Sequence, residues 1–303
     1  MSGDNAQNAS AARPPIRWPS EAIWQAVVGS VPDFSVEVVP SIDSTNTELM
    51  RRARAGRCEP ILLVTEEQTA GRGRLGRPWQ SQETGHAQDQ GPASLMMSLG
   101  LPIRPKEWSG LSLAVGVSVA DSIQPEIPRE DSGVPRVGLK WPNDLWLSGD
   151  RKFGGILVET ASFVAPQSMY PTEPDNALRY VVVGIGLNVL PRPGEGMTTQ
   201  PACLTEIDAR WTAPEALLAI IPPLIQTLQT IARTGFAPFK QRFEQRDLLR
   251  GRTVNLSNGE SGEARGVSDD GTLLVETAAG VQAITSADIS VRPAGQPLPG
   301  QSA

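Results

Sequence analysis

Residues 137–159 read VGLKWPNDLWLSGDRKFGGILVE. This stretch contains three apolar runs, at residues 137–141, 145–147 and 155–159, and each run has the length and composition typical of a buried strand. A short polar turn separates each run from the next. The stretch therefore predicts three consecutive strands joined by turns that carry polar side chains.

Elements on both sides of this stretch complete a mixed pattern. Thr45 and Glu48 form a capping box at the start of a helix, and Gly56 is placed to end it. A second capping box, at residues 212–215, begins a helix that the proline pair at residues 222–223 should distort. Further strands are expected at residues 61–64, 94–99 and 180–189, and further helices at residues 21–28, 108–123 and 236–249. The sequence thus predicts an α+β fold.

The sequence pattern changes at residue 252, after which short predicted strands alternate with Asn-Gly and Asp-Gly turns. This spacing predicts a separate small β-barrel of about 45 residues. The first residues are rich in Ala, Ser, Asn and Pro without apolar periodicity, which is typical of disorder. We expect a disordered lead-in at residues 1–20, a catalytic domain at 21–249, the small β domain at 250–293 and a tail at 294–303.

Composition excludes several classes of protein. The chain has 303 residues, a net charge of −6, 2 cysteines and 1 histidine, and an acidic balance disfavours a broad nucleic-acid surface. The two cysteines and His86 are too few for a disulfide framework, most zinc sites or a Ser-His-Asp triad. No signal-peptide pattern is visible, and prolines and glutamines interrupt the longest apolar stretch, at residues 216–232. We expect a soluble, cytoplasmic protein that binds neither a membrane nor nucleic acid.

A loop of glycines and arginines follows the strand at residues 61–64. Residues 71–77 read GRGRLGR and match the dinucleotide fingerprint G-x-G-x-x-G, but residues 77–79 show no helical pattern, so we reject a Rossmann nucleotide site. The three arginines alternate with glycines, and arginine binds carboxylate or phosphate through paired hydrogen bonds. The residue types favour an anion-binding loop and a solvated basic hairpin equally.

Other polar groups lie in turns and at strand ends. Asn143 and Asp144 could hold Mg²⁺ or ribose hydroxyls, and Lys152 could neutralise charge on a phosphate or acyl oxygen. Taken alone, Lys152 is more simply a turn lysine, and Asn143-Asp144 is equally well a turn. Residues 184–188 read GIGLN inside the longest apolar strand, where glycines indicate either a β-bulge or the close approach of a ligand.

Five segments in this order resemble those of the biotin–protein ligases, also called biotin–acetyl-CoA-carboxylase ligases. They are SIDSTN at residues 41–46, the loop segment at 65–77, KWPNDL at 140–145, RKFGGILVE at 151–159 and GIGLN at 184–188. The terminal β domain has the position and size expected for that family. The resemblance implies a mixed-sheet catalytic domain like that of class II aminoacyl-tRNA synthetases, followed by an SH3-like barrel.

The resemblance also implies a reaction in two steps. Biotin and MgATP give biotinyl-5′-AMP and pyrophosphate, and the biotinyl group then passes to a lysine of the biotin carboxyl carrier protein of acetyl-CoA carboxylase. A lipoate–protein ligase and a non-enzymatic adenylate-binding regulator are the alternatives. The arginine loop with K-W-P-N-D disfavours the lipoate ligase, and a missing DNA-binding domain opposes the regulator.

Carried over position by position, the resemblance implies a set of candidate site residues. Biotin would contact Ser44, Thr45, Asn46, Gln68, Arg72, Gly73, Arg74 and Lys152. The nucleotide and its Mg²⁺ would contact Arg74, Asn143, Asp144, Lys152 and Asn188, with Mg²⁺ bound through the nucleotide and Asp144 as its candidate protein ligand. Lys152 and Arg74 are the expected catalytic residues.

Departures from the family pattern bear on function. Members that also repress transcription carry a winged helix-turn-helix before the S-T-N segment, and the residues before Ser41 are too few for one. We therefore expect no repressor activity. We expect an exposed, mobile insertion at residues 80–93 and a hairpin at residues 164–177, and how they affect closure of the loop stays open. An edge strand could serve a homodimer or acceptor docking equally well.

Overall fold

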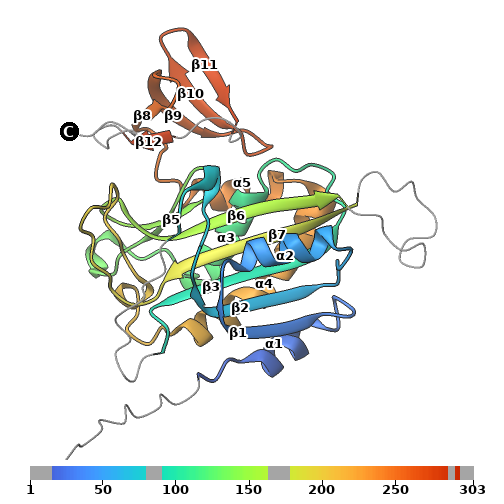
Figure 1. Cartoon of the computed structure of the whole chain (residues 1–303). Helices are drawn as coiled ribbons and strands as arrows, with labels where there is room; N and C mark the ends of the chain where they lie inside the picture. Colours follow the sequence, from blue (N-terminus) through green and yellow to red (C-terminus); the bar gives the residue numbers. More distant parts are fainter. Residues whose placement is uncertain (1–15, 80–90, 163–177, 286–290, 294–303) are drawn as a thin grey trace, which may run out of the picture.

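The computed structural model describes residues 16–79, 91–162, 178–285 and 291–293. These residues form a larger part with helices on a sheet and a smaller β part at the C-terminal end (Figure 1). His86, the tail and most of the lead-in lie outside the described residues, as do most of the two insertions. The expected domain boundaries stay predictions.

A seven-stranded sheet forms the centre of the larger part, with the strand order β1-β2-β3-β7-β6-β5-β4. β1 and β2 are parallel, and the other neighbouring pairs are antiparallel. The strands are β1 (Ser35–Ile42), β2 (Ile61–Gln68), β3 (Ser94–Ile103), β4 (Val137–Lys140), β5 (Asp144–Leu147), β6 (Arg151–Ser162) and β7 (Arg179–Asn188). The expected mixed α+β fold is confirmed.

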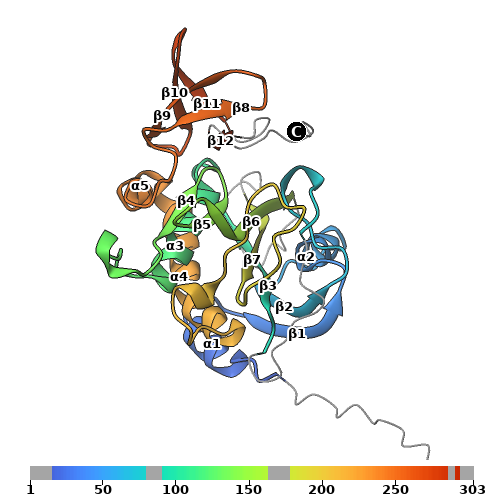
Figure 2. The same cartoon turned by 90° about the vertical axis from the view of Figure 1, so that its left-hand side faces the viewer.

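Helices cover both faces of this sheet (Figures 1 and 2). The larger hydrophobic core lies under α1 (Ser20–Val27), α3 (Leu111–Ile123) and α4 (Ala213–Thr234). α2 (Thr45–Arg54) packs alone on the opposite face through an apolar side made of Leu49, Met50 and Ala53. α5 (Ala237–Glu244) packs beside α3. This arrangement leaves the N-terminal end of α2 beside the middle of the sheet.

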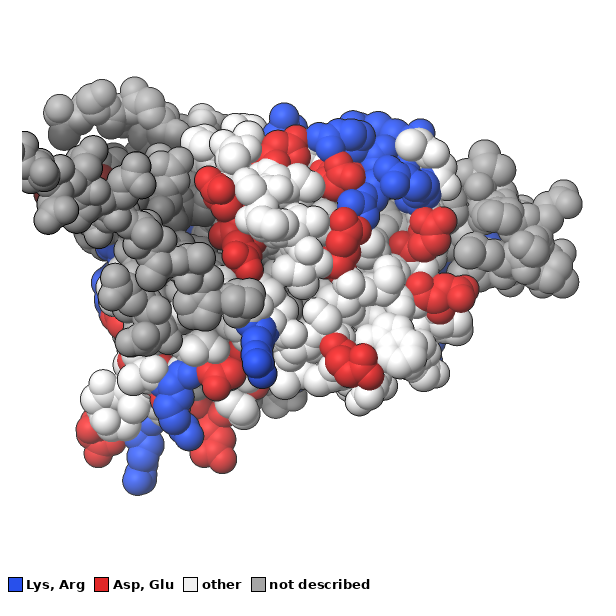
Figure 3. Space-filling view, turned by 60° about the horizontal axis from the view of Figure 1, so that its bottom comes forward, with Lys and Arg blue, Asp and Glu red and all other residues white. Residues whose placement is uncertain are grey.

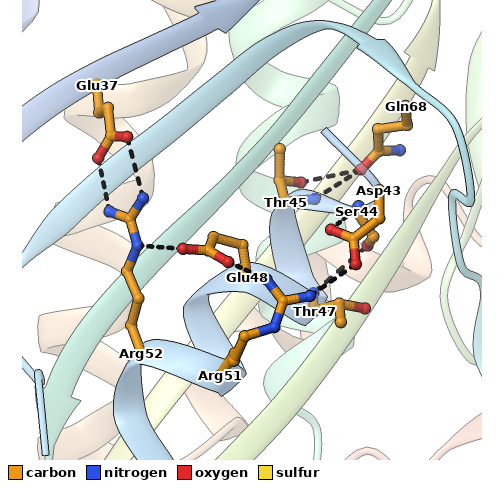
Figure 4. A network of polar contacts seen from close by, with 9 residues as sticks. All are labelled: Glu37, Asp43, Ser44, Thr45, Thr47, Glu48, Arg51, Arg52 and Gln68. Carbon is orange, nitrogen blue, oxygen red and sulfur yellow. Dashed lines mark hydrogen bonds and ion pairs between the residues drawn. The ribbon is translucent and has the colours of Figure 1, made fainter. Parts of the chain in front are cut away.

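The start of α2 differs in detail from the expected capping box. The helix begins at Thr45 as predicted, but Ser44 is the N-cap, and its side chain accepts from the Thr47 N–H at 3.4 Å. Glu48 does not reach back to the helix start, because it pairs with Arg51 and Arg52 (Figure 4). The predicted capping pair is therefore wrong, and a serine one residue earlier satisfies the free N–H group.

The sequence did not predict β1. This strand pairs with β2 alone, so it forms an edge of the sheet, and none of its residues is fully buried. Pro40 lies within it, and proline is tolerated at an edge because no ladder hydrogen bond is lost there. Half-buried edge strands lack the continuous apolar run that marked β2 and β7.

Other element boundaries also differ. α3 begins at Leu111 instead of residue 108, because Gly110 has a left-handed backbone with φ of 73°. α4 is assigned without a break through Pro222 and Pro223, so the expected distortion does not interrupt the helix. β6 begins at Arg151, which places Lys152 within a strand and not in a turn. α5 ends at Glu244, earlier than the predicted residue 249.

α4 is long and apolar enough to cross a membrane by length and composition, and it is the one such helix in the described part of the chain. Most of its large apolar residues, among them Ile220, Ile221 and Leu224, are fully buried in the core that it shares with α1, α3 and β3. The helix therefore acts as the core helix of the larger part.

The smaller part is a five-stranded antiparallel sheet, which confirms the predicted β domain. Its strand order is β11-β10-β9-β8-β12. The strands are β8 (Thr253–Leu256), β9 (Ser261–Val267), β10 (Leu273–Thr277), β11 (Gly280–Ile284) and β12 (Val291–Pro293). Trp141 Nε1 donates to the Gly271 carbonyl at 3.1 Å, and Arg252 binds both carboxylate oxygens of Asp150 at 2.7 and 2.6 Å. These contacts join the β domain to the turns that flank β5.

Candidate active site

One cavity of about 220 Å³ gathers most of the candidate residues. It lies between the N-terminal end of α2, the loop at residues 71–79 and the strands β5, β6 and β7. The predicted residues that line it are Ser44, Thr45, Asn46, Gln68, Arg72, Gly73, Arg74, Asn143, Asp144 and Lys152. The fold thus brings four separate sequence motifs to one place.

The uncharged end of the cavity is a hydrogen-bonded group at the start of α2 (Figure 4). The Thr45 backbone N–H donates to Gln68 Oε1 at 2.9 Å, and Thr45 Oγ1 lies 3.2 Å from the same oxygen. Behind Thr45, Ser98 of β3 is fully buried, with its Oγ 2.7 Å from Thr45 Oγ1. A small number of fixed polar groups is typical of pockets that hold a small-molecule ligand in one orientation.

Two glycines of β7 make room for this arrangement. A Cβ added at Gly184 would lie 2.1 Å from Asn46 Oδ1, and one at Gly186 would lie 2.6 Å from the Trp79 ring. β7 keeps an unbroken register with both β3 and β6. The bulge interpretation of these glycines is therefore wrong, and they serve instead the close approach of side chains to the sheet.

The charged end of the cavity is a carboxylate surrounded by cations. Lys152 Nζ lies 2.6 Å from Asp144 Oδ1, and Lys140 Nζ lies 3.9 Å from Asp144 Oδ2. Burial alone would raise the pKa of Asp144, but the two lysines and Arg74 outweigh it and hold that pKa below its ordinary value. Asp144 is therefore ionised and a poor proton acceptor. The surplus of positive charge suits an anionic substrate.

The loop at residues 71–79 closes on itself beside this charged end. The Trp79 N–H donates to the Gly71 carbonyl at 2.9 Å, and the backbone of residues 77–79 is extended. Arg74 donates to Asn143 Oδ1 at 3.4 Å, and burial lowers the pKa of its guanidinium. The loop is thus a hairpin, as the interpretation of a solvated basic hairpin held. Arg74 nevertheless lines the cavity, as the interpretation of an anion-binding loop required.

Asn188 lies behind the cavity and does not line it. Its side chain is buried, and its Nδ2 donates to the Ala202 carbonyl at 3.0 Å. The Ala202 N–H in turn donates to the Lys152 carbonyl at 2.9 Å. The expected role of Asn188 at the nucleotide finds no support in this geometry, which instead ties the chain after β7 to the strand of Lys152.

Several residues that line the cavity were not among the candidates from the sequence, including Trp79, Met97, Lys140 and Trp146. Trp79 and Lys140 stand at the ends of motifs that had been recognised, so adjacency to those motifs is the signal that could have found them. Lys140 Nζ lies 5.2 Å from the centroid of the Trp146 ring. Such a contact between neighbouring strands has no local signature in the sequence.

The metal-binding capacity of the site is small. Within the residues that the structure describes, no group of three or more His, Cys, Asp or Glu side chains converges. Among the described residues that line the cavity, Asp144 is the one carboxylate, and the Asn143 carboxamide is beside it. This donor set fits a Mg²⁺ held mostly by phosphate oxygens and water, with one or two protein ligands, as this ion commonly binds.

Comparison with known proteins agrees with this picture. The sequence model of the biotin/lipoate A/B protein ligase family matches residues 38–169, and that of the biotin protein ligase C terminal domain matches residues 251–292. The fold, the cavity and these matches together define a ligase of the biotin and lipoate class.

Individual relatives narrow the class. The chain is 31% identical to the biotin–[acetyl-CoA-carboxylase] ligase of Mycobacterium tuberculosis (84% of this chain, 88% of the relative). It is also 31% identical to the bifunctional ligase/repressor BirA of Escherichia coli (88% of this chain, 77% of the relative). The solved biotin protein ligase from Aquifex aeolicus in complex with biotin and ATP is similar with a TM-score of 0.65 and 28% identity, covering 85% of this chain and 98% of that one. The chain belongs to the biotin–protein ligase family.

Proposed function

We propose that this chain activates biotin with MgATP and transfers it to a lysine of the biotin carboxyl carrier protein of acetyl-CoA carboxylase. The observation that supports this proposal is the difference between the two ends of the cavity. One end has fixed hydrogen-bonding groups at Thr45 and Gln68, and the other end is cationic, with Lys140, Lys152 and Arg74. Biotin has matching parts, a cyclic urea and a carboxylate on a flexible chain. The relatives named biotin ligases support the same assignment.

In the first step, a biotin carboxylate oxygen forms a bond to the α-phosphorus of ATP. The bond from that phosphorus to the bridging oxygen breaks, and pyrophosphate leaves. Both reactants are anionic and must approach to about 3–3.5 Å before they react. Lys152 and Arg74 offset the repulsion between them, and Lys140 keeps Asp144 paired when Lys152 turns to the substrate. Asp144 and Asn143 would hold a bound Mg²⁺, which would supply further charge neutralisation.

In the second step, the amine of the carrier lysine attacks the acyl carbon of biotinyl-5′-AMP. The new amide bond forms, the bond to the AMP oxygen breaks, and the amine loses a proton. Because the intermediate is a reactive mixed anhydride, the site must exclude water until the acceptor arrives. The hairpin at residues 71–79, which lines the cavity through Arg72, Arg74 and Trp79, supplies that cover.

Partners and location follow from this assignment. The acceptor is a protein, and the chain works in the cytoplasm, where biotin-dependent carboxylases meet their ligase. We propose no nucleic-acid role. The face shown in Figure 3 has one local basic patch, but acidic side chains lie among the basic ones on that face. An edge strand of the sheet suits either a homodimer or the docking of the acceptor protein, and we do not choose between these two uses.

The test is ATP–pyrophosphate exchange by the purified chain with MgATP and biotin, lipoate or neither. We expect exchange that requires biotin, followed by labelling of a carrier domain when one is added. Exchange with lipoate alone would assign the chain to lipoate ligation. A folded protein that shows no exchange with either acid would overturn the adenylation proposal.

A further inference from the structure

We propose that Ser98 is a positioning residue that fixes the hydrogen-bond polarity of the uncharged end of the cavity. Ser98 is fully buried in β3 and does not line the cavity. Its Oγ lies 2.7 Å from Thr45 Oγ1 and 2.6 Å from Asn46 Oδ1. It therefore supports two lining side chains from behind. The inference rests on the proposed binding of biotin.

The orientation of the Asn46 amide is settled by its other contacts. Asn46 Nδ2 donates to Glu159 Oε2 at 2.9 Å and lies 3.3 Å from the Leu157 carbonyl. Both partners are acceptors, so the amide nitrogen must point toward them, and Asn46 Oδ1 must point toward Ser98. Gly184 leaves the space that this orientation needs, because a Cβ there would lie 2.1 Å from Asn46 Oδ1.

Counting hydroxyl protons then fixes the direction of the neighbouring bonds. Ser98 has one hydroxyl proton, and Asn46 Oδ1 cannot donate, so Ser98 donates to Asn46. Ser98 Oγ also donates to Thr45 Oγ1 at 2.7 Å, and Thr45 Oγ1 donates its own proton to Gln68 Oε1 at 3.2 Å. The Thr45 backbone N–H donates to the same Gln68 oxygen at 2.9 Å, so both donors of Thr45 are used within the protein.

This network turns Thr45 into a hydrogen-bond acceptor for the ligand. With its proton directed to Gln68 and Ser98 donating to it from behind, Thr45 Oγ1 has no proton left for a ligand and presents a lone pair to the cavity that it lines. Lone pairs match the N–H groups of a cyclic urea, and a dithiolane ring has no donor to offer them. Ser98 therefore helps select the urea-containing acid without touching it.

The test compares Ser98→Ala with Ser98→Thr, which restores the hydroxyl. Biotin affinity is measured by calorimetry on the full chain without nucleotide, and KM for biotin and for ATP by pyrophosphate exchange. Loss of one buried hydrogen-bond partner is expected to weaken biotin binding about 10- to 100-fold. We expect KM for ATP at saturating biotin to change little, and Ser98→Thr to recover most of the affinity.

Ser118→Ala is the matched control, because Ser118 of α3 is also buried and its hydroxyl has no partner among the described residues. It should bind biotin as the wild type does. Glu159→Ala, at a partly exposed position, removes the nearer of the two acceptors of Asn46 Nδ2 and should weaken biotin binding about tenfold even if Ser98→Ala fails to fold. Wild-type affinity in folded Ser98→Ala, or in Glu159→Ala, would overturn the positioning role. Failure of the wild type to bind biotin would instead overturn the proposed function.

Discussion

Lys152 has to serve two anions in turn. In the structure its ammonium is bound to Asp144 at 2.6 Å, yet the proposed chemistry needs it at the biotin carboxylate and the α-phosphate. Lys140, 3.9 Å from the other oxygen of Asp144, allows the exchange, because the carboxylate keeps a cation when Lys152 leaves. A buried carboxylate left without any partner would cost far more.

The first prediction concerns the charge of Lys152. Lys152→Gln should lower the rate of biotin-dependent pyrophosphate exchange about 10²–10³-fold, the range found when one transition-state contact is removed. The matched control is Lys240→Gln, which breaks a lysine–aspartate pair of similar length, 2.7 Å to Asp269 against 2.6 Å for Lys152, outside the cavity. Equal rates in the two variants would remove Lys152 from the chemistry.

The second prediction concerns Asp247, in the segment between α5 and β8. Burial raises its pKa to about 6 from the ordinary 3.8, partly opposed by the Leu249 and Arg250 backbone N–H groups. The folded state therefore holds a proton that the unfolded state releases, and stability from this group falls as pH rises from about 4 to 6 and beyond. Asp247→Asn should be more stable than the wild type, and its advantage should grow by about 1 kcal/mol between pH 5 and 7.5.

Urea unfolding at the two pH values measures this difference. Asp131→Asn, at an exposed position, is the control and should follow the wild type at both values. An advantage of Asp247→Asn that is constant with pH would show that Asp247 does not titrate in this range.

Candidate site residues were predictable where a short sequence motif contains them. The S-T-N segment, the arginine loop and Lys152 each occur in short motifs, and the structure brings them into one cavity. Asn188 has a side chain that could contact a nucleotide. A polar side chain at a strand end can, however, bind either a ligand or the backbone behind it. Ser98 gave no signal, since its role depends on contacts between two elements, β3 and α2, that lie far apart in the sequence.

At the scale of elements, burial determined what could be predicted. β7 is buried along most of its length and β2 along half of its length, and both strands were found from apolar runs. β1 is half-buried at a sheet edge, and its pairing with β2 is set by the sheet and not by its own sequence. The helix at residues 45–54 was found because its turn-forming ends are local signals.

The third prediction concerns the hairpin at residues 71–79 as an element. Arg74 links it to the turn before β5 through Asn143. Arg74→Gly should loosen this closure, so that biotinyl-5′-AMP escapes into solution faster than from the wild type. Chromatography of the acid-quenched filtrate after a single turnover measures the released adenylate. Arg129→Gly, in an exposed turn remote from the cavity, is the control, and equal release from all three proteins would contradict the closing role.

For the whole molecule, the β domain is joined to the site-bearing turns at several points. Gly271 packs so closely that a Cβ there would lie 2.7 Å from the Gly110 Cα. Arg252 binds Asp150, two residues before Lys152, and Trp141, three residues before Asp144, donates to the Gly271 carbonyl. The β domain thus holds the two turns from which the charged end of the cavity extends. The sequence of neither domain predicts these contacts, because the apolar pattern of each domain reflects only the core of that domain.

The last prediction tests that coupling with Trp141→Phe, which keeps an aromatic ring but removes the Nε1–H donor. The Gly271 carbonyl would lose a buried partner, and the turn leading to Asn143 and Asp144 would lose its tie to the β domain. Because we propose that these residues contact the nucleotide, we expect KM for ATP to rise about tenfold while biotin affinity stays unchanged. Trp24→Phe, at a partly exposed position on α1, is the control. If Trp141→Phe lowers the melting temperature but leaves KM for ATP at the wild-type value, the interdomain hydrogen bond stabilises the fold without tuning the site.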